Sequence, residues 1–216
     1  MRQPRWFCEV MNAEEFEPFP LELYPETLFQ RLRPEELFAG SEAPLEIDLG
    51  CGDGRFLQAM AEEFPQRNFL GVERLLGRVR KVCRRSDRAG LSNIKALRLE
   101  TTYAVEWLLP KKSAERVHLL FPDPWPKKKH HKRRLMAQQD FLKSVADLLK
   151  EGGEFLFKTD HEEYFEVAQE AAAACPYFDV LDWPDGGFFY AETDFERQWT
   201  EAGRRIQGLR LLKVSN

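Results

Sequence analysis

The chain has 216 residues, with 43% hydrophobic and 31% charged residues and a formal net charge of −4, so it is neither disordered nor low in complexity. No apolar run approaches the roughly 18 residues that a membrane-spanning helix needs. Because the first residues also lack the apolar stretch of a signal peptide, we expect a cytoplasmic protein with no membrane partner.

Strands and helices are predicted to alternate from residue 44 onward. The expected strands are 44–49, 68–73, 93–99, 116–121 and 154–159, and the expected helices are 54–64, 74–88, 101–109, 135–150 and 161–174, followed by strand character at 177–181 and 209–214. This alternation predicts an α/β fold with a mostly parallel sheet and helices on both faces. We expect one domain over residues 41–216, preceded by an N-terminal extension of residues 1–40.

The four cysteines are not spaced as metal ligands or as a disulfide framework. No two of them form C-x-x-C, and no histidine lies three or four residues from any of them. The sequence therefore predicts lone buried thiols, at Cys8, Cys51, Cys83 and Cys175, and no metal site.

Positive charge is concentrated in two stretches of an otherwise acidic chain. Residues 127–134 read KKKHHKRR, and residues 74–88 contain seven Lys or Arg against the single acid Asp87. In the second stretch Arg74, Arg78, Lys81, Arg85 and Arg88 follow one another at helical spacing. Since binding of a polyanion depends on local patches more than on net charge, this distribution favours a nucleic-acid partner.

A glycine turn follows the first strand of the alternating pattern. Gly50, Gly52 and Gly54 form G-x-G-x-G between a strand and a helix, where glycine lets a ligand lie against bare backbone. Dinucleotide-binding folds place a small residue at the next position, and this chain has Arg55. The turn therefore favours a cofactor without a pyrophosphate, such as S-adenosylmethionine.

Carboxylates stand at the expected carboxyl ends of the strands. Glu73, 19 residues after Gly54, is predicted to accept hydrogen bonds from the hydroxyls of an adenosine ribose. Glu100 is a candidate acceptor for the adenine amino group. Asp48 would fix the glycine loop or bind an ammonium group of the cofactor. Glu46 lies two residues earlier on the same face of the strand, so the sequence leaves open which of the two carboxylates has a structural role.

The most distinctive segment is FPDPWPKKKHHKRRL, residues 121–135. Three prolines stiffen the loop and aim Asp123, while Phe121 and Trp125 offer surfaces on which a base can stack. The basic run follows directly, so the segment combines an acid, aromatic rings and phosphate-binding cations. Two weaker motifs are FKTD, with Lys158 and Asp160, and TDFE at 193–196.

Together, LEIDLGCGDG, GVE, FPDPWPKKKHHKRRL, FKTD and TDFE closely resemble the tRNA (guanine-N7-)-methyltransferases, in their order and spacing, over about residues 44–206. The resemblance implies a Rossmann-like, doubly wound class I methyltransferase fold. It also implies an enzyme that uses S-adenosylmethionine to methylate a guanine in the variable loop of tRNA.

The resemblance also implies roles for individual residues. It suggests Asp48, Glu73, Glu100 and Asp123, with the glycine turn, as cofactor-binding positions, and Asp123 as the catalytic residue. Substrate contacts are suggested at Lys127, Asp160, Thr193, Asp194, Phe195 and Glu196. The family usually has Glu at the position of Asp48 and often Asp at that of Glu100. Both positions therefore keep a carboxylate, on a side chain that is shorter at Asp48 and longer at Glu100.

Three other interpretations fit the residues less well. A catalytically silent RNA-binding module would not need the carboxylates Asp48, Glu73 and Glu100. A small-molecule methyltransferase would not need the basic run, and Arg55 disfavours an oxidoreductase. Whether the protein is a monomer or a homodimer is left open.

Overall fold

The computed structural model describes residues 19–183 and 189–214. In these residues eight strands form one sheet in the order β1-β4-β3-β2-β5-β6-β8-β7. The strands are β1 Glu22–Leu23, β2 Leu45–Leu49, β3 Asn68–Glu73, β4 Ile94–Arg98, β5 Ala114–Leu120, β6 Leu149–Thr159, β7 Phe178–Leu181 and β8 Gln207–Lys213. All neighbours from β1 to β6 pair in parallel, and β8 joins β6 and β7 antiparallel, which confirms the predicted mostly parallel sheet.

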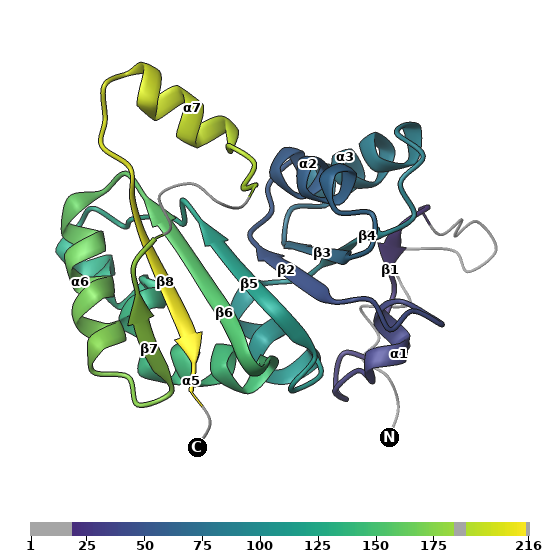
Figure 1. Cartoon of the computed structure of the whole chain (residues 1–216), viewed down its shortest axis with the longest axis horizontal. Helices are drawn as coiled ribbons and strands as arrows, with labels where there is room; N and C mark the ends of the chain where they lie inside the picture. Colours follow the sequence, from purple (N-terminus) through teal and green to yellow (C-terminus); the bar gives the residue numbers. More distant parts are fainter. Residues whose placement is uncertain (1–18, 184–188, 215–216) are drawn as a thin grey trace.

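Helices cover both faces of the sheet, as Figure 1 shows. They are α1 Pro34–Leu37, α2 Arg55–Glu63, α3 Leu76–Arg88, α4 Thr101–Tyr103, α5 Gln139–Leu148, α6 Glu162–Ala173 and α7 Asp194–Glu201, with a π-helix η2 at Ala104–Leu108 and 3-10 helices η3 at Lys128–Arg133 and η4 at Leu135–Ala137. Among them, no helix of the described chain combines the length and the apolar character that a bilayer span requires.

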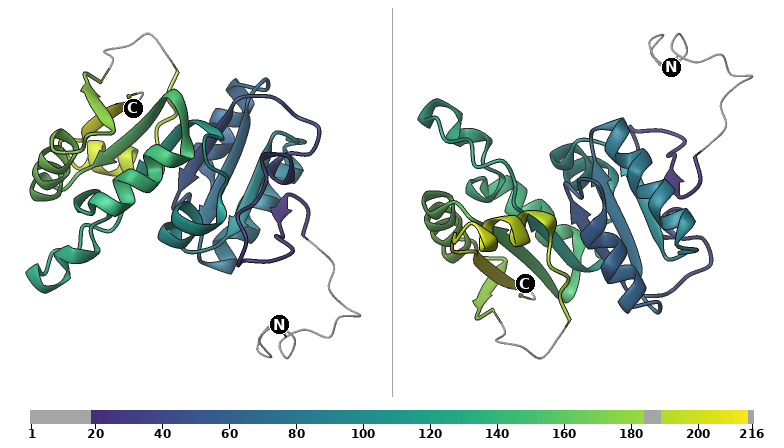
Figure 2. Two further views of the ribbon diagram at one scale, coloured as in Figure 1. Left: turned by 90° about the horizontal axis from the view of Figure 1, so that it is seen from below. Right: turned by 90° about the horizontal axis from the view of Figure 1, so that it is seen from above.

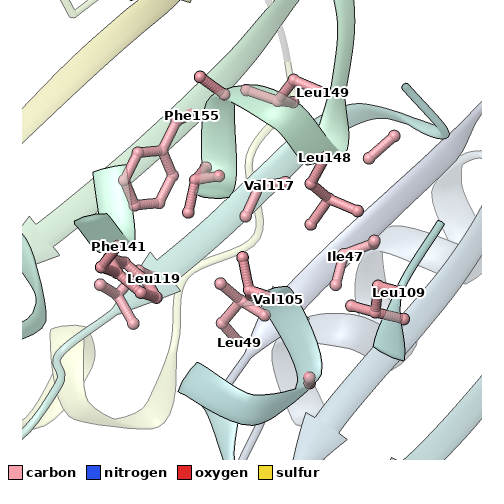
Figure 3. Close-up of a cluster of buried hydrophobic side chains, with 14 of the residues drawn as sticks. Ile47, Leu49, Val105, Leu109, Val117, Leu119, Phe141, Leu148, Leu149 and Phe155 are labelled. Atoms are coloured by element: carbon pink, nitrogen blue, oxygen red, sulfur yellow. The ribbon is translucent and has the colours of Figure 1, made fainter. Parts of the chain in front are cut away.

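The sheet separates two apolar clusters. On one face, α2 and α3 pack on β3 and β4 through residues such as Phe56, Met60 and Val82. On the other face, η2, α5 and α6 pack on β2, β5 and β6, and Figure 3 shows part of this cluster around Ile47 and Val117. Because strand side chains alternate between faces, Ile47 and Leu49 enter this second cluster while Glu46 and Asp48 face the α2 side.

The predicted elements agree with the structure, with two corrections. The expected helix 135–150 is wrong at its end, because α5 stops at Leu148 and β6 begins at Leu149. Gly152 and Gly153 therefore lie inside a strand, where the pairing with β5 changes register between Ala114 and Arg116. The expected helix 101–109 is divided into α4 and the π-helix η2.

Residues 19–40 pack against the same sheet as the rest of the chain. β1 pairs in parallel with β4, and Leu32, Leu37 and Phe38 are buried in the larger apolar cluster. Cys51, Cys83 and Cys175 are buried free thiols, whereas Cys8 lies outside the described residues.

Candidate functional site

The strand order reverses at β2, which lies between β3 and β5. Ligands of open parallel sheets bind at the carboxyl ends of the strands beside such a reversal. The loop after β2 carries the glycine turn, β3 ends at Glu73, and Asp123 follows β5. This carboxyl edge is therefore the candidate site, and α7 lies along it (Figure 1).

The glycine turn needs glycine at three positions. Gly50, Gly52 and Gly54 have φ values of 80°, 58° and 78°, in the left-handed region. A Cβ added to Gly50 or Gly52 would meet nothing within 4 Å, so these two expose open backbone, whereas one on Gly54 would lie 2.7 Å from Val82 of α3. The first two glycines thus leave room for a ligand above the turn. The third allows α3 to pack closely against the turn.

Replacing Gly54 with alanine is expected to cost about 2–4 kcal/mol of unfolding free energy, because left-handed strain and overpacking against Val82 add together. Gly52→Ala is the matched control: it carries the same strain over open space and should cost only about 1–2 kcal/mol. Urea denaturation of both variants measures the difference. Equal losses would show that contact with α3 does not constrain the turn.

Asp48 and Glu73 form an acidic floor beside the turn. Both are buried, at 3% and 5% exposure. Burial and the nearby Glu73 raise the pKa of Asp48 to about 7, and within the described residues its carboxylate has no hydrogen-bond or salt-bridge partner. Glu73 accepts a hydrogen bond from the Leu75 amide at 2.9 Å and lies 3.6 Å from Arg78. Positive charge from a ligand would therefore be favourable above Asp48.

Glu46 is the structural member of the Glu46–Asp48 pair. Its fully buried carboxylate accepts a hydrogen bond from His118 Nε2 at 2.9 Å and lies 3.2 Å from Arg67. Burial lowers the pKa of His118, so its neutral ring accepts at Nδ1 the hydroxyl proton of Tyr190, 2.9 Å away. The chain of bonds ties β2 and β5 to the segment that precedes α7.

Glu100 lies at the carboxyl edge and also caps the helix α4. One of its carboxylate oxygens accepts the Tyr103 amide at 2.9 Å and begins α4. The side chain is exposed after β4, two strands away from β2. It occupies the predicted edge, and its orientation is fixed by the cap.

The loop after β5 is held in a strained conformation. Phe121 and Trp125 have φ values of 50° and 47°, which non-glycine residues rarely adopt. Between them Asp123 is exposed, and no hydrogen bond or ion pair engages its carboxylate within the residues that the structure describes. The loop thus presents a free carboxylate at a fixed place.

The basic run forms an arm that projects from the body of the protein, as both views in Figure 2 show. Five of its cations are exposed, namely Lys127, Lys128, Lys129, Lys132 and Arg133. Arg134 is the exception among the cations of residues 127–134, because it is only 1% exposed. It donates to the Pro124 carbonyl at 2.8 Å and lies 3.3 Å from Glu163, so it anchors the arm.

Replacing Arg134 with methionine is expected to lower the unfolding free energy by about 2 kcal/mol, because the half-buried Pro124 carbonyl loses its donor. The amides of residues 124–134 should then exchange hydrogen faster, as measured by mass spectrometry. Lys132→Met, which removes one exposed cation from the same arm, should leave both quantities unchanged. If the two variants exchange alike, Arg134 is not the anchor.

α7 is tied across the carboxyl edge by ion pairs. Asp194 lies 2.6 Å from Arg55, next to the glycine turn, and Glu196 lies 2.5 Å from Lys158. The second Glu196 oxygen is buried without a hydrogen-bond partner in the described chain. Thr193 caps the helix, and Asp160 lies 2.6 Å from Arg204, just after α7.

Phe195 joins the two halves of the site. It is 52% exposed, and its ring lies 6.3 Å from that of Phe121, two residues before Asp123. The pair Arg55–Asp194 and the pair Phe195–Phe121 therefore connect the glycine turn to the Asp123 loop through one helix. The structure thus brings the TDFE motif next to both the glycine turn and the Asp123 loop.

Sequence reasoning missed several residues of this edge. Gly71 in β3 leaves room for Cys51, since a Cβ would lie 2.6 Å from its sulfur, and an isolated glycine within a strand pattern was the signal for this. His118 and Tyr190 had no local signal. They are paired only through the adjacency of β5 to the segment before α7.

Two cavities of the described chain lie away from this edge. One of about 280 Å³, lined by Arg67, Glu115 and Lys150, and one of about 420 Å³, lined by Asn68 and Asn93, both lie at the amino ends of the strands. The carboxyl edge instead combines a buried acidic floor with an exposed cationic arm. Such an arrangement suits a cationic ligand inside and a polyanion outside.

Comparison with known proteins places the chain among methyltransferases. Residues 42–209 match the family model described as "Putative methyltransferase". A tRNA (guanine-N(7)-)-methyltransferase of Saccharophagus degradans is 34% identical over 178 residues, 82% of this chain and 76% of the relative. That of Thermus thermophilus is 36% identical over 83% of this chain, and that of Thermotoga maritima is 29% identical over 95%. The chain spans only 57% and 62% of the length of these last two relatives.

Solved structures share the fold. The antibiotic-resistance methyltransferase Kmr superposes with a TM-score of 0.58 at 20% identity, over 86% of this chain and 94% of that one. The 16S rRNA (adenine(1408)-N(1))-methyltransferase from Catenulisporales acidiphilia gives 0.59 at 18% identity, over 86% and 95%. The predicted Rossmann-like methyltransferase fold is confirmed.

Proposed function

Because the chain belongs to the tRNA (guanine-N(7)-)-methyltransferase family, we propose that it transfers a methyl group from S-adenosylmethionine to N7 of a guanine in the variable loop of tRNA. The observation that carries this proposal is the free Asp123 carboxylate, which follows β5, the neighbour of the strand that leads into the glycine turn, and directly precedes the cationic arm.

The residues at the glycine turn fit a cationic adenosyl donor. Asp48 is buried without a partner in the described chain, and Gly50 and Gly52 leave open space over bare backbone. We assign the ammonium group of the donor to Asp48, its ribose hydroxyls to Glu73, and its adenine amino group to Glu100. S-adenosylmethionine supplies the methyl carbon on a sulfonium, whose C–S bond breaks as the N7 lone pair attacks in line.

The chain's own task is to orient the base. Guanine N7 carries a lone pair and no proton, so no residue has to act as a general base. Asp123 accepts hydrogen bonds from guanine N1–H and the exocyclic amine, which turns N7 toward the glycine turn and stabilises the positive charge that develops on the ring. Phe195, half exposed, and Phe121 offer stacking surfaces beside it.

The exposed arm holds the backbone of the RNA. Lys127 and its exposed neighbours lie immediately beyond Asp123, so they reach phosphates close to the target base. Thr193, Asp194 and Glu196 shape the opposite rim through α7, and Asp160 supports the end of that helix through Arg204. The RNA would thus enter between the arm and α7.

The test is incubation of the full chain with labelled S-adenosylmethionine and unmodified tRNA transcript. We expect label in the tRNA and aniline-sensitive cleavage at one guanine of the variable loop, which marks 7-methylguanine. A transcript with adenine at that position is the control and should take up no label. Labelling without aniline-sensitive cleavage would refute the proposed position, and absence of labelling would refute the activity.

A further inference from the structure

The outward side of α3 is the most strongly charged helical surface that the proposed site does not use. We define the α3 cationic face as the exposed residues Arg74, Arg78, Arg80, Lys81, Arg84 and Arg88. The opposite side of the helix buries Val79, Val82 and Cys83 against the sheet. The cations are therefore presented outward by packing, over a helix of 13 residues and about 20 Å.

Internal pairing does not neutralise this face. Among its members, Arg78 lies 3.6 Å from the buried Glu73, and Arg84 stacks 5.6 Å from the Phe19 ring. Within the described residues, Arg80, Lys81 and Arg88 form no salt bridge to a carboxylate. Three free cations therefore stand on one helix of a chain whose formal net charge is −4.

The stability of α3 does not account for the spacing of its exposed cations. Arg80 and Arg84, and Arg84 and Arg88, are like-charged pairs four residues apart, each costing about 0.2–0.5 kcal/mol. Asp87 is the only acid in the helix. A polyanion bound to this side of the helix would relieve the repulsion between these pairs.

The face lies on the far side of the site from the arm. α3 follows β3, whose last residue is Glu73, so the helix starts at the carboxyl edge. The arm follows β5, on the other side of β2, and in the view from above in Figure 2 the arm and α3 lie on opposite sides of the molecule. An RNA held at both places would span the site.

We propose that the α3 cationic face is a second phosphate-binding surface, which holds the backbone of the tRNA body away from the target guanine. The inference rests on the proposed function, since it extends the footprint of the same substrate. Contacts from Arg and Lys to phosphates fix the position of the RNA and carry no sequence information, so this surface adds affinity without sequence preference.

The test is the triple variant Arg80→Gln, Lys81→Gln and Arg88→Gln, which spares every residue paired within the protein. Lys111→Gln, Lys143→Gln and Lys150→Gln are the control matched in charge, because these three exposed lysines lie outside α3 and the arm. Lys111 and Lys150 pair with Asp147 and Glu115, so the folding of the control is checked by its unfolding free energy. Each triple variant removes three positive charges. We measure the dissociation constant for tRNA against salt concentration, together with kcat and KM for methylation.

For the α3 variant we expect tRNA affinity to fall by about 10- to 100-fold at moderate salt, and the log–log salt slope to decrease by about two. The kcat at saturating tRNA and the affinity for S-adenosylmethionine should stay within about twofold of the wild type, since no residue of the site is changed. The control variant should bind tRNA as the wild type does.

Unchanged tRNA affinity and slope in the α3 variant would overturn the inference, and the proposed function would stand if the wild type methylates tRNA. A wild type that neither binds nor methylates tRNA would overturn both. If the triple variant does not fold, Arg80→Gln with Lys81→Gln, and Arg88→Gln alone, should show two thirds and one third of the slope change. An equal effect of the control variant would also refute a specific surface.

Discussion

Replacing Asp123 with alanine is expected to lower the kcat of tRNA methylation by at least about 100-fold, the range lost when a positioned charge-stabilising group is removed from an active site. The affinity for S-adenosylmethionine should fall by less than about threefold. The physical reason is that Asp123 is exposed and has no partner within the described chain, so its loss changes neither the fold nor the acidic floor. Single-turnover kinetics with saturating tRNA measures the chemical step.

Asp123→Asn sharpens this test. The amide keeps the shape of the side chain and replaces one acceptor oxygen with a donor, which would face the N–H groups of guanine. We therefore expect a loss close to that of alanine. Asp179→Asn, on the edge strand β7, is the control and should retain full activity. A parallel loss of turnover and donor affinity in the Asp123 variants would show that this residue holds the donor and does not orient the base.

Asp48→Asn is expected to stabilise the protein without ligand at pH 8 and to weaken its affinity for S-adenosylmethionine by about tenfold or more. Burial raises the pKa of Asp48 to about 7 from an ordinary value of 3.8, a difference that corresponds to about 4 kcal/mol. Below pH 3.8 the carboxyl is protonated in both states, so the substitution should have little effect there.

Between these two pKa values the unfolded chain loses the proton first, so the wild type loses stability relative to the variant as the pH rises. Above pH 7 the difference stays constant. Thermal denaturation from pH 4 to pH 8, with and without S-adenosylmethionine, measures both effects. Destabilisation by asparagine at pH 8, together with unchanged ligand affinity, would contradict the role of Asp48 as a buried acceptor for a cationic ligand.

The carboxyl edge of the sheet was predictable because each strand has a local pattern. β2, β3 and β5 are short apolar runs, and the residues that follow them share one edge in any parallel sheet. The positions of Asp48, Glu73 and Asp123 on this edge follow from that rule. The expected helix 135–150 extended too far because Gly152 and Gly153 lie at a bulge inside a strand, and glycines there give the same local signal as glycines that end a helix.

Other features depend on contacts between distant segments. Whether Glu46 or Asp48 is buried in an ion network is decided by Arg67 and His118, which lie 21 and 72 residues away from Glu46. Likewise, the inward turn of Arg134 depends on Pro124 and Glu163, and nothing within the basic run distinguishes Arg134 from Arg133. α7 was not predicted, because its polar sequence is held at the site by ion pairs rather than by an apolar face.

Because β2 lies at the centre of the sheet, the two proposed binding tasks fall to different halves of the chain. The residues proposed to hold the ammonium, ribose and adenine groups of the donor all precede residue 101, whereas those proposed to hold the target base follow β5. The two halves meet where β2 pairs with β5, through the ion pair of Arg55 with Asp194, and through the bond between Glu46 and His118. A change of target nucleotide would therefore call for substitutions in the second half of the chain, while the residues that hold the donor stay as they are.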